Sequence, residues 1–212
     1  MTNSPTDSLR HTPLHAWHVA HGAKTADFGG WDMPIEYTGI VAEHTAVREA
    51  VGVFDVSHMG KLVLTGADVD QWLNTVVASN LDDIAFGKAQ YSMLLNAAGG
   101  VIDDLIVYRL CQTEFLIIAN AGNRENVVTA LQERAVGFEV EVRDDSDDYA
   151  LIAIRYLTTT VSSTLIPHFP VKYNPGSMVM TSFFLSFMSG ALELMTTPSW
   201  ISNPSPCPSA CE

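Results

Sequence analysis

The sequence predicts an α+β fold, with antiparallel sheets and helices inserted among the strands. Two observations lead to this prediction. Stretches with the spacing of amphipathic helices lie among β-rich stretches, and three of the β-rich stretches are joined by links so short that neighbouring strands must run antiparallel. With 212 residues, of which 47% are hydrophobic, the chain can also bury a sizeable core.

Three helices are expected from the sequence. Thr38 is expected to cap the first, which ends at Gly52, and Asp68 is expected to open the second. The third begins at Asn123 and is stopped by Gly137. The apolar residues follow the i, i+3, i+4, i+7 spacing of one helix face, most clearly at Val69, Trp72, Leu73 and Val76.

β-rich stretches surround these helices at residues 54–66, 89–96, 101–110, 114–120 and 138–143. The second, third and fourth of them are separated by the short turn sequences AAGG and CQT, so they are expected to form an antiparallel meander. Residues 150–154 begin one more strand.

The segment GGVIDDLIVYR contains two adjacent carboxylates within an apolar strand. Side-chain alternation predicts one face made of Ile102, Asp104, Ile106 and Tyr108, and an opposite face made of Val101, Asp103, Leu105 and Val107. An ionised aspartate between apolar faces is costly unless it is paired or meets a ligand. Two interpretations follow from the spacing: the pair leaves the Gly99–Gly100 turn into solvent, or it forms a site.

Other polar clusters predict no chemistry. His15, His18 and His21 follow an i, i+3, i+6 spacing that drifts around a helix, and neither a cysteine nor a carboxylate completes a ligand set, so no metal site is expected. Ser57 and His58 diverge on a strand and do not form a nucleophile–base pair. The double glycines have no nucleotide-binding fingerprint around them.

The net charge of −13 belongs to the first part of the chain, because the charges after Ile154 cancel: they are Arg155, Lys172, Glu193 and Glu212. So acidic a surface disfavours nucleic acid and anionic membranes as partners. Residues 155–212 are rich in Ser, Thr and Pro, hold seven of the ten prolines and show no helix or strand period, so a disordered tail is expected.

No membrane span is predicted, although residues 173–192 contain no charged side chain. Asn, Pro, Ser, Thr and Gly interrupt this run, and basic residues do not flank it. The three cysteines, Cys111, Cys207 and Cys211, are too few and too unevenly placed for a disulfide framework. The first residues also lack the apolar run of a signal peptide, so a cytoplasmic protein is expected.

Four blocks of sequence add a resemblance to a known family. The segments TPLHAWHVAHGAKTADFGGWDMPIEY, EHTAVREAVGVFDVSHMGKLVLTG, GKAQYSMLLNAAGGVIDDLIVYRL and FLIIANAGNRE include the signatures DFGGWDMP, GVFDVSHMG and GG-x-x-DD. In this order and spacing they resemble the aminomethyltransferase (T-protein) family of the glycine cleavage system, from Thr12 to about Ile154. Where the family continues ALIA-x-Q-G-P, this chain reads ALIAIRYLTTT.

The resemblance implies a transferase that moves the methylene carbon of an aminomethyl group from the lipoyl arm of the H-protein to tetrahydrofolate, with release of ammonia. It implies a catalytic role for Asp104, and a folate cavity lined by Met59, Tyr91, Asp104, Tyr108 and Asn120, with no metal. Residues 1–154 are then the N-terminal folate-binding region, and residues 155–212 are an unrelated, frameshift-like tail. A chain truncated in this way is expected to have little activity alone.

Three alternatives are weighed against this interpretation. The folate domain of a sarcosine or dimethylglycine dehydrogenase is disfavoured by the form DVSHMG and by the chain opening at TPLH. A non-catalytic folate-binding or iron–sulfur assembly relative is disfavoured by the Asp103–Asp104 pair. The third alternative is a structural fragment without a ligand.

Overall fold

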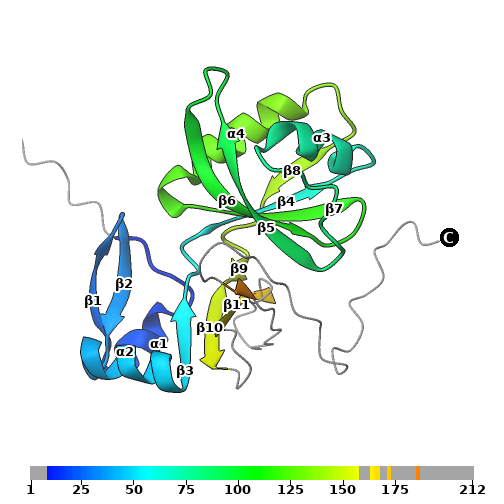
Figure 1. Cartoon of the computed structure of the whole chain (residues 1–212). Helices are drawn as coiled ribbons and strands as arrows, with labels where there is room; N and C mark the ends of the chain where they lie inside the picture. The colour runs from blue at the N-terminus through cyan, green and yellow to red at the C-terminus, as the bar shows by residue number, and fades with distance from the viewer. Residues whose placement is uncertain (1–8, 158–162, 168–170, 173–184, 187–212) are drawn as a thin grey trace, which may run out of the picture.

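The computed structural model describes residues 9–157, 163–167, 171–172 and 185–186 (Figure 1). Its helices are α1 (His15–Ala20), α2 (Ile40–Glu49), α3 (Val69–Val76), the 3-10 helix η1 (Ala121–Asn123) and α4 (Arg124–Ala135). Its strands are β1 (Lys24–Phe28), β2 (Trp31–Glu36), β3 (Val51–Asp55), β4 (Gly60–Thr65), β5 (Lys88–Leu95), β6 (Val101–Arg109), β7 (Glu114–Ala119), β8 (Glu141–Asp144), β9 (Tyr149–Ala150), β10 (Ile152–Leu157), β11 (Ser163–Pro167), β12 (Val171–Lys172) and β13 (Leu185–Ser186). The predicted α+β class is confirmed.

The largest sheet has five antiparallel strands in the order β5-β6-β7-β4-β8, and its first three strands form the expected meander. Helices α3 and α4 cover one face of this sheet (Figure 1). The main core lies between these two helices and the sheet. Its fully buried side chains include Leu64, Trp72, Phe115, Ile117 and Leu131. The predicted site residues Tyr91, Asp104 and Tyr108 lie on strands β5 and β6 of this sheet.

The hairpin of β1 and β2 is not among the strands expected from the sequence. Its turn is the pair Gly29 and Gly30, with φ of +61° and +87°, and the Asp27 carboxylate accepts a 2.8 Å hydrogen bond from the Gly30 N–H. Glycine reaches positive φ without a steric penalty, and a two-residue turn of this kind is the usual connection of a tight hairpin. The Gly-Gly signal was therefore present in the sequence.

Helix α2 begins as expected near residue 40 but is capped differently. The Thr38 side chain does not cap it; instead the Glu43 carboxylate accepts hydrogen bonds from the backbone N–H groups of Tyr37, Thr38 and Gly39 at 2.7, 2.6 and 3.1 Å. The helix ends at Glu49 and not at Gly52, because the residues that follow pair with β10 as strand β3. The expected starts of α3 after Asp68 and of α4 after Asn123 are confirmed.

The stretch 54–66, expected as one strand, is two strands separated by a turn. The Asp55 carboxylate accepts a 2.9 Å hydrogen bond from the Ser57 N–H, and the Met59 N–H donates to the Val56 carbonyl at 3.1 Å. An aspartate that bonds the backbone two residues on favours a turn over continued strand. As a result β3 pairs with β10, whereas β4 pairs with β7 and β8 in the other sheet.

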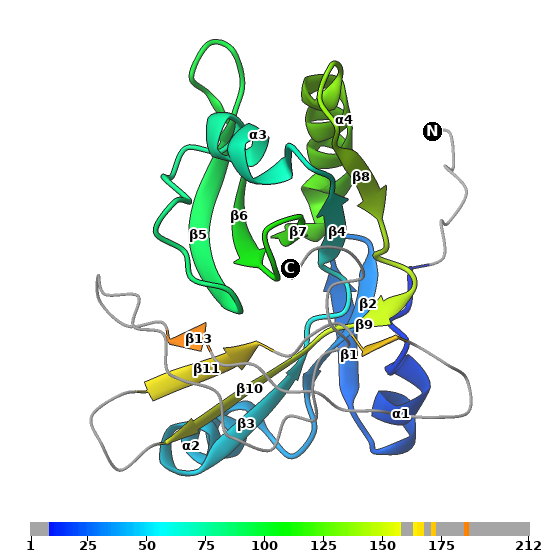
Figure 2. The same cartoon turned by 90° about the vertical axis from the view of Figure 1, so that its right-hand side faces the viewer.

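A second sheet has the order β13-β11-β10-β3, and Figure 2 shows β3, β10 and β11 side by side. Strand β10 continues past Ile154 to Leu157 and pairs with β11, so the first residues of the expected tail extend this sheet. The expectation of a disordered tail otherwise falls largely outside the described residues, as does the run 173–192 apart from Leu185–Ser186. In the described part of the chain, every helix is too short or too polar to cross a membrane.

The packing of α3 and α4 on the sheet predicts the stability effect of Trp72. Its indole is 1% exposed and its N–H donates to the Arg134 carbonyl at 2.9 Å. We expect Trp72→Ala to lower the free energy of unfolding by about 3–5 kcal/mol in urea denaturation, because it removes a large buried ring and leaves a cavity. Val136→Ala, at a side chain 80% exposed just after α4, is the control and should cost less than about 0.5 kcal/mol. Equal losses would contradict this description of the core.

Candidate functional site

The two faces of β6 have different surroundings. Leu105 and Val107 belong to the core under α3 and α4, whereas Ile106 and Tyr108 belong to a smaller apolar cluster on the other face. This second cluster consists of Val63, Ala89, Tyr108, Leu116, Ile118 and Leu151, with Val56, Met59, Ile106 and Leu110 packed against it. The alternation of β6 places Asp103 on the helix-covered face and Asp104 on the face of the second cluster.

The predicted alternation is wrong at one residue. Ile102 was expected to share a face with Asp104, but it packs against the core that contains Leu105. The pairing of β5 with β6 shifts at this point: Leu94 is opposite Asp103, and Leu95 is opposite Val101, so Ile102 is an extra residue. Such a bulge interrupts the alternation of side chains and explains the change of face.

Asp104 is exposed, and two neighbouring side chains hold its carboxylate. The Tyr91 hydroxyl on β5 donates a short hydrogen bond to Oδ2, and Asn120 Nδ2, just after β7, donates to Oδ1 at 3.0 Å. The bond to Asp104 is the largest cause that raises the pKa of Tyr91 to about 12. At neutral pH Tyr91 is therefore a hydrogen-bond donor that keeps the carboxylate oriented.

Asp103 has a different environment, because it is 4% exposed on the covered face. Its carboxylate accepts hydrogen bonds from the Asn120 N–H at 2.9 Å, from Asn120 Nδ2 at 3.0 Å and from Asn123 Nδ2 at 3.2 Å. These bonds connect β6 to the segment that joins β7 to α4. The expectation that the pair leaves the turn into solvent is therefore wrong for Asp103, which is buried and bonded within the fold, whereas the carboxylate of Asp104 is exposed.

The five predicted site residues fall into two groups. Tyr91, Asp104 and Asn120 form one hydrogen-bonded group, and Tyr91 is 47% exposed. Met59 and Tyr108 belong to the apolar cluster on the same face of the sheet, where burial raises the pKa of the Tyr108 hydroxyl. Tyr91 lies opposite Ile106, which stands between Asp104 and Tyr108 on β6 and so joins the polar group to the apolar one.

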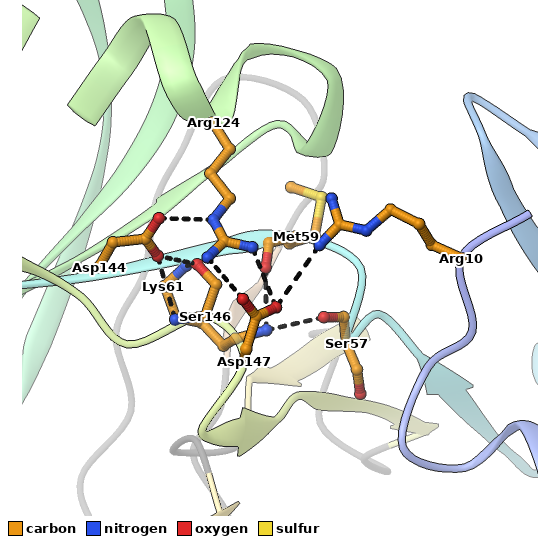
Figure 3. A network of polar contacts seen from close by, with 8 residues as sticks. All are labelled: Arg10, Ser57, Met59, Lys61, Arg124, Asp144, Ser146 and Asp147. Carbon is orange, nitrogen blue, oxygen red and sulfur yellow. Dashed lines mark hydrogen bonds and ion pairs between the residues drawn. The ribbon is translucent and has the colours of Figure 1, made fainter. Parts of the chain in front are cut away.

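Lys61 is a buried charged residue that was not among the predicted site residues. Its side chain is inaccessible to solvent, and Nζ donates to the carbonyls of Ser57 at 2.7 Å and Met59 at 2.9 Å (Figure 3). The amine thus holds the turn from which Met59 reaches the apolar cluster. A lone lysine between a turn and the apolar run LVL is the sequence signal that could have identified it.

An ionic network surrounds this lysine (Figure 3). The Arg124 guanidinium bonds Asp144 at 2.6 Å and Asp147 at 3.0 Å, and Arg10 approaches Asp147 at 3.5 Å. The Lys61 N–H donates to Ser146 Oγ at 2.8 Å within the same segment. Burial, with a smaller contribution from the Arg124 charge, lowers the pKa of Lys61 to about 8.

The other polar clusters are now placed. His18 lies 2.5 Å from the Tyr37 hydroxyl and 2.9 Å from Asp55 Oδ2, while His21 Nδ1 lies 2.8 Å from the Trp17 carbonyl oxygen. His15 turns away from both and faces Asp32 at 3.7 Å. The three histidines therefore face different groups, but the expectation that no carboxylate joins them is wrong at His15, because Asp32 and His11 lie beside it.

Ser57 and His58 lie in the turn between β3 and β4. The Ser57 hydroxyl accepts from the Leu151 N–H at 2.9 Å and donates to the Leu151 carbonyl at 3.3 Å. The His58 ring meets Phe28 edge to face, with ring centroids 5.6 Å apart. Ser57 is thus part of the backbone junction before β10, while the His58 ring packs on the β1–β2 hairpin.

Comparison with known proteins identifies the family. The model of the GCVT N-terminal domain matches residues 14–155. The chain belongs to this family. The match ends at residue 155, one residue beyond Ile154, where the resemblance expected from the sequence stops.

Relatives in this GCVT family are named aminomethyltransferases. The chain is 52% identical over 147 residues to that of Corynebacterium jeikeium, covering 69% of this chain and 38% of the relative. It is 40% identical over 190 residues to that of Deinococcus deserti, covering 90% of this chain and 52% of the relative. The crystal structure of glycine cleavage system aminomethyltransferase T from Bartonella henselae matches with a TM-score of 0.66 at 36% identity, over 69% of this chain and 40% of that one. The chain thus spans about two fifths to one half of these relatives.

The division of roles between the two aspartates can be tested by stability. We expect Asp103→Ala to lower the free energy of unfolding by about 3 kcal/mol, because it removes a buried carboxylate that accepts from partly buried donors of Asn120 and Asn123. Asp104→Ala, at an exposed side chain, should cost under about 1 kcal/mol. Urea unfolding followed by circular dichroism measures both. A larger loss for Asp104→Ala would reverse the assignment.

The buried amine of Lys61 predicts a pH dependence. The amine of Lys61 has a pKa of about 8 in the folded state and its ordinary value of 10.5 in the unfolded chain. Between these two pH values the unfolded state therefore binds more protons than the folded state. The free energy of unfolding consequently rises with pH in this interval. Lys61→Met removes this gain. Between pH 7 and 9.5 the free energy of unfolding of the unmodified chain should rise relative to Lys61→Met by about 2 kcal/mol.

Lys24→Met is the matched control for this measurement. Glu36 raises the pKa of Lys24, so Lys24 stays protonated in both states over this pH range and its removal should produce no such rise. A difference between the unmodified chain and Lys61→Met that does not change with pH would show that the folded state keeps the Lys61 proton.

Proposed function

We propose that residues 1–154 are the tetrahydrofolate-binding part of an aminomethyltransferase of the glycine cleavage system, with Asp104 as its catalytic carboxylate. The observation that carries this proposal is the exposed Asp104 carboxylate, held by Tyr91 and Asn120 at the border of an apolar cluster, in a chain of the GCVT family. The names of the aminomethyltransferase relatives support the reaction class.

The residues present suit a folate. The half-exposed ring of Tyr91 offers an aromatic face to a flat heterocycle, and Asn120 and Asp104 offer polar edges beside it. The partly buried Met59 and the buried Tyr108 belong to the apolar cluster on the same face of the sheet. A few fixed polar groups at the edge of an apolar wall are typical of cofactor sites.

In the proposed reaction the methylene carbon leaves the sulfur of the dihydrolipoyl arm and ammonia is released. Tetrahydrofolate, when bound, supplies the nitrogen acceptors for this carbon. Asp104 stabilises the positive charge that develops as the carbon–sulfur bond breaks, because a fixed anion beside a developing cation lowers the barrier. Tyr91 and Asn120 hold the carboxylate in place beforehand, so that it does not have to reorient during the reaction.

The proposal includes the partners and the organisation of the chain. The partner is the lipoylated H-protein, and neither nucleic acid, a membrane nor a metal takes part in the transfer. We propose that residues 155–212 form a separate segment unrelated to the transferase, supported by the change in charge and proline content and by the end of the domain-model match at residue 155. The alignment with the Deinococcus deserti relative runs past residue 155 and is the one observation against this division. A cytoplasmic location is proposed from the cysteine content.

Folate binding tests the role of Asp104. We expect tetrahydrofolate to quench the tryptophan fluorescence of the 212-residue chain in a weak but saturable way, and Asp104→Asn to weaken binding at least about 10-fold, because a hydrogen bond to a charged group is lost. Asp83→Asn, an exposed aspartate outside the site, is the matched control and should bind like the unmodified chain. Equal binding by Asp104→Asn and the unmodified chain would remove Asp104 from the site.

Turnover tests the contribution of the remaining length of the relatives. We expect these 212 residues to release ammonia from an aminomethyl-lipoyl carrier far more slowly than the Corynebacterium jeikeium relative, because the chain supplies 38% of that protein's length and one wall of the proposed site. Folate-dependent ammonia release measures this. A rate equal to the relative's would show that these 212 residues carry the whole activity.

A further inference from the structure

A cluster of three side chains lies away from the proposed folate site, where the first described residues meet α1 and the β1–β2 hairpin. Its members are His11, His15 at the start of α1, and Asp32 on β2. Their nearest ligand atoms all lie within 4.8 Å of one another. The folate proposal uses none of these residues.

Backbone hydrogen bonds bring these side chains together. The Arg10 N–H donates to the Gly30 carbonyl, and the Asp32 N–H donates to the Arg10 carbonyl, both at 2.9 Å. On the other side of His11, the Thr12 hydroxyl donates to Asp55 at 2.6 Å, and the His15 N–H donates to the Thr12 carbonyl at 3.1 Å. The residues on either side of His11 are therefore fixed before any ligand binds.

The distances are close to those of a tetrahedral metal site. Asp32 Oδ2 lies 3.7 Å from His15 Nδ1 and 4.0 Å from His11 Nε2. Zinc binds nitrogen and carboxylate oxygen at about 2.0–2.2 Å, so two tetrahedral ligand atoms lie roughly 3.4 Å apart. Both histidine–aspartate distances exceed this value by a few tenths of an ångström, and the two imidazoles must also reorient to share one metal, because the three ligand atoms are within 4.8 Å of one another but the rings are stacked.

The state of the two imidazoles also points to a ligand. His15 Nδ1 is buried and lacks a hydrogen-bond partner in the described part of the chain. The rings of His11 and His15 are stacked, with centroids 3.7 Å apart and planes 6° apart. One dication could engage a ring nitrogen of each imidazole, while the Asp32 carboxylate offsets part of its charge.

Metal binding requires the two stacked imidazole rings to rotate away from each other, and the exposure of His11 leaves room for this rotation. The His11 side chain is 56% exposed and can turn, whereas those of His15 and Asp32 are 17% and 22% exposed. The neighbouring cation, Arg10, stacks over the Trp31 ring at 4.2 Å and pairs with Asp147. The Arg10 charge is thus engaged by other groups.

We propose that His11, His15 and Asp32 bind a divalent transition metal of zinc-like preference, with water as the remaining ligand. Two imidazoles and one carboxylate favour zinc, cobalt or nickel over magnesium or calcium, which prefer oxygen ligands. The metal would clip the segment around His11 and the start of α1 to the β1–β2 hairpin. Its role would be structural and independent of the methylene transfer.

Cobalt(II) binding tests the site, because tetrahedral cobalt absorbs visible light and reports its ligand geometry. The test uses the metal-stripped full chain with Cys207→Ser and Cys211→Ser, so that these thiols do not compete. We expect one equivalent of cobalt to bind with a tetrahedral spectrum and to be displaced by zinc. Asp32→Asn and His15→Ala should each weaken binding at least about 10-fold, and His11→Ala should weaken it as well.

The matched control is His44→Ala, which removes an exposed histidine of α2 and should leave cobalt binding unchanged. A second measurement is the midpoint of thermal unfolding, which zinc should raise in the unmodified chain but not in Asp32→Asn, a variant of nearly the same shape. Circular dichroism establishes that each variant is folded. The proposal is overturned if cobalt does not bind saturably, or if it binds equally well to Asp32→Asn and His15→Ala; the contact of Asp32 would then be an ordinary histidine–carboxylate pair.

Discussion

Side chains of neighbouring residues on a β-strand point to opposite faces of the sheet, and on β6 this constraint separates two adjacent aspartates. Asp103 enters the face covered by α3 and α4, where an unpaired carboxylate would be costly, and the donors of Asn120 and Asn123 remove that cost. Asp104 points to the opposite face and stays exposed. Asn120 contacts both carboxylates, so the buried aspartate positions the amide that holds the exposed one.

The turn between β3 and β4 depends on a second buried polar group. Lys61 is taken out of water at the start of β4, and its amine finds the carbonyls of Ser57 and Met59 instead of a carboxylate. The carboxylates of Asp144 and Asp147 lie nearby but are bonded to Arg124. The backbone N–H of Lys61 donates to Ser146 Oγ, so Lys61 connects the turn that carries Met59 to the segment that follows β8.

The pairing of β10 explains how the structure continues where the match to the family model ends. Strand β10 pairs with β3 from Ile152 to Tyr156, and the family match ends at residue 155. Ladder hydrogen bonds are made by backbone groups, which every residue other than proline carries alike. Strand pairing can therefore cross the junction at Ile154 whatever side chains follow it.

Much of this protein was determined by the sequence alone. The short links at residues 97–100 and 111–113 determined the β5–β6–β7 meander, because strands joined so closely must run antiparallel. The apolar spacing located α3 and α4, and the order of the motifs indicated the family. The Gly29–Gly30 hairpin signal was also present, although β1 and β2 were not among the expected strands.

Tertiary structure decided what local patterns could not. The bulge at Ile102 depends on how β5 pairs with β6, and the cap of α2 depends on where the Glu43 side chain can reach. The separate roles of Asp103 and Asp104 depend on which face the helices cover. The approach of His11, His15 and Asp32 joins residues distant along the chain through backbone pairing. Local sequence specifies the period of side chains along an element, but the partners that those side chains meet are set by the packing of elements against one another.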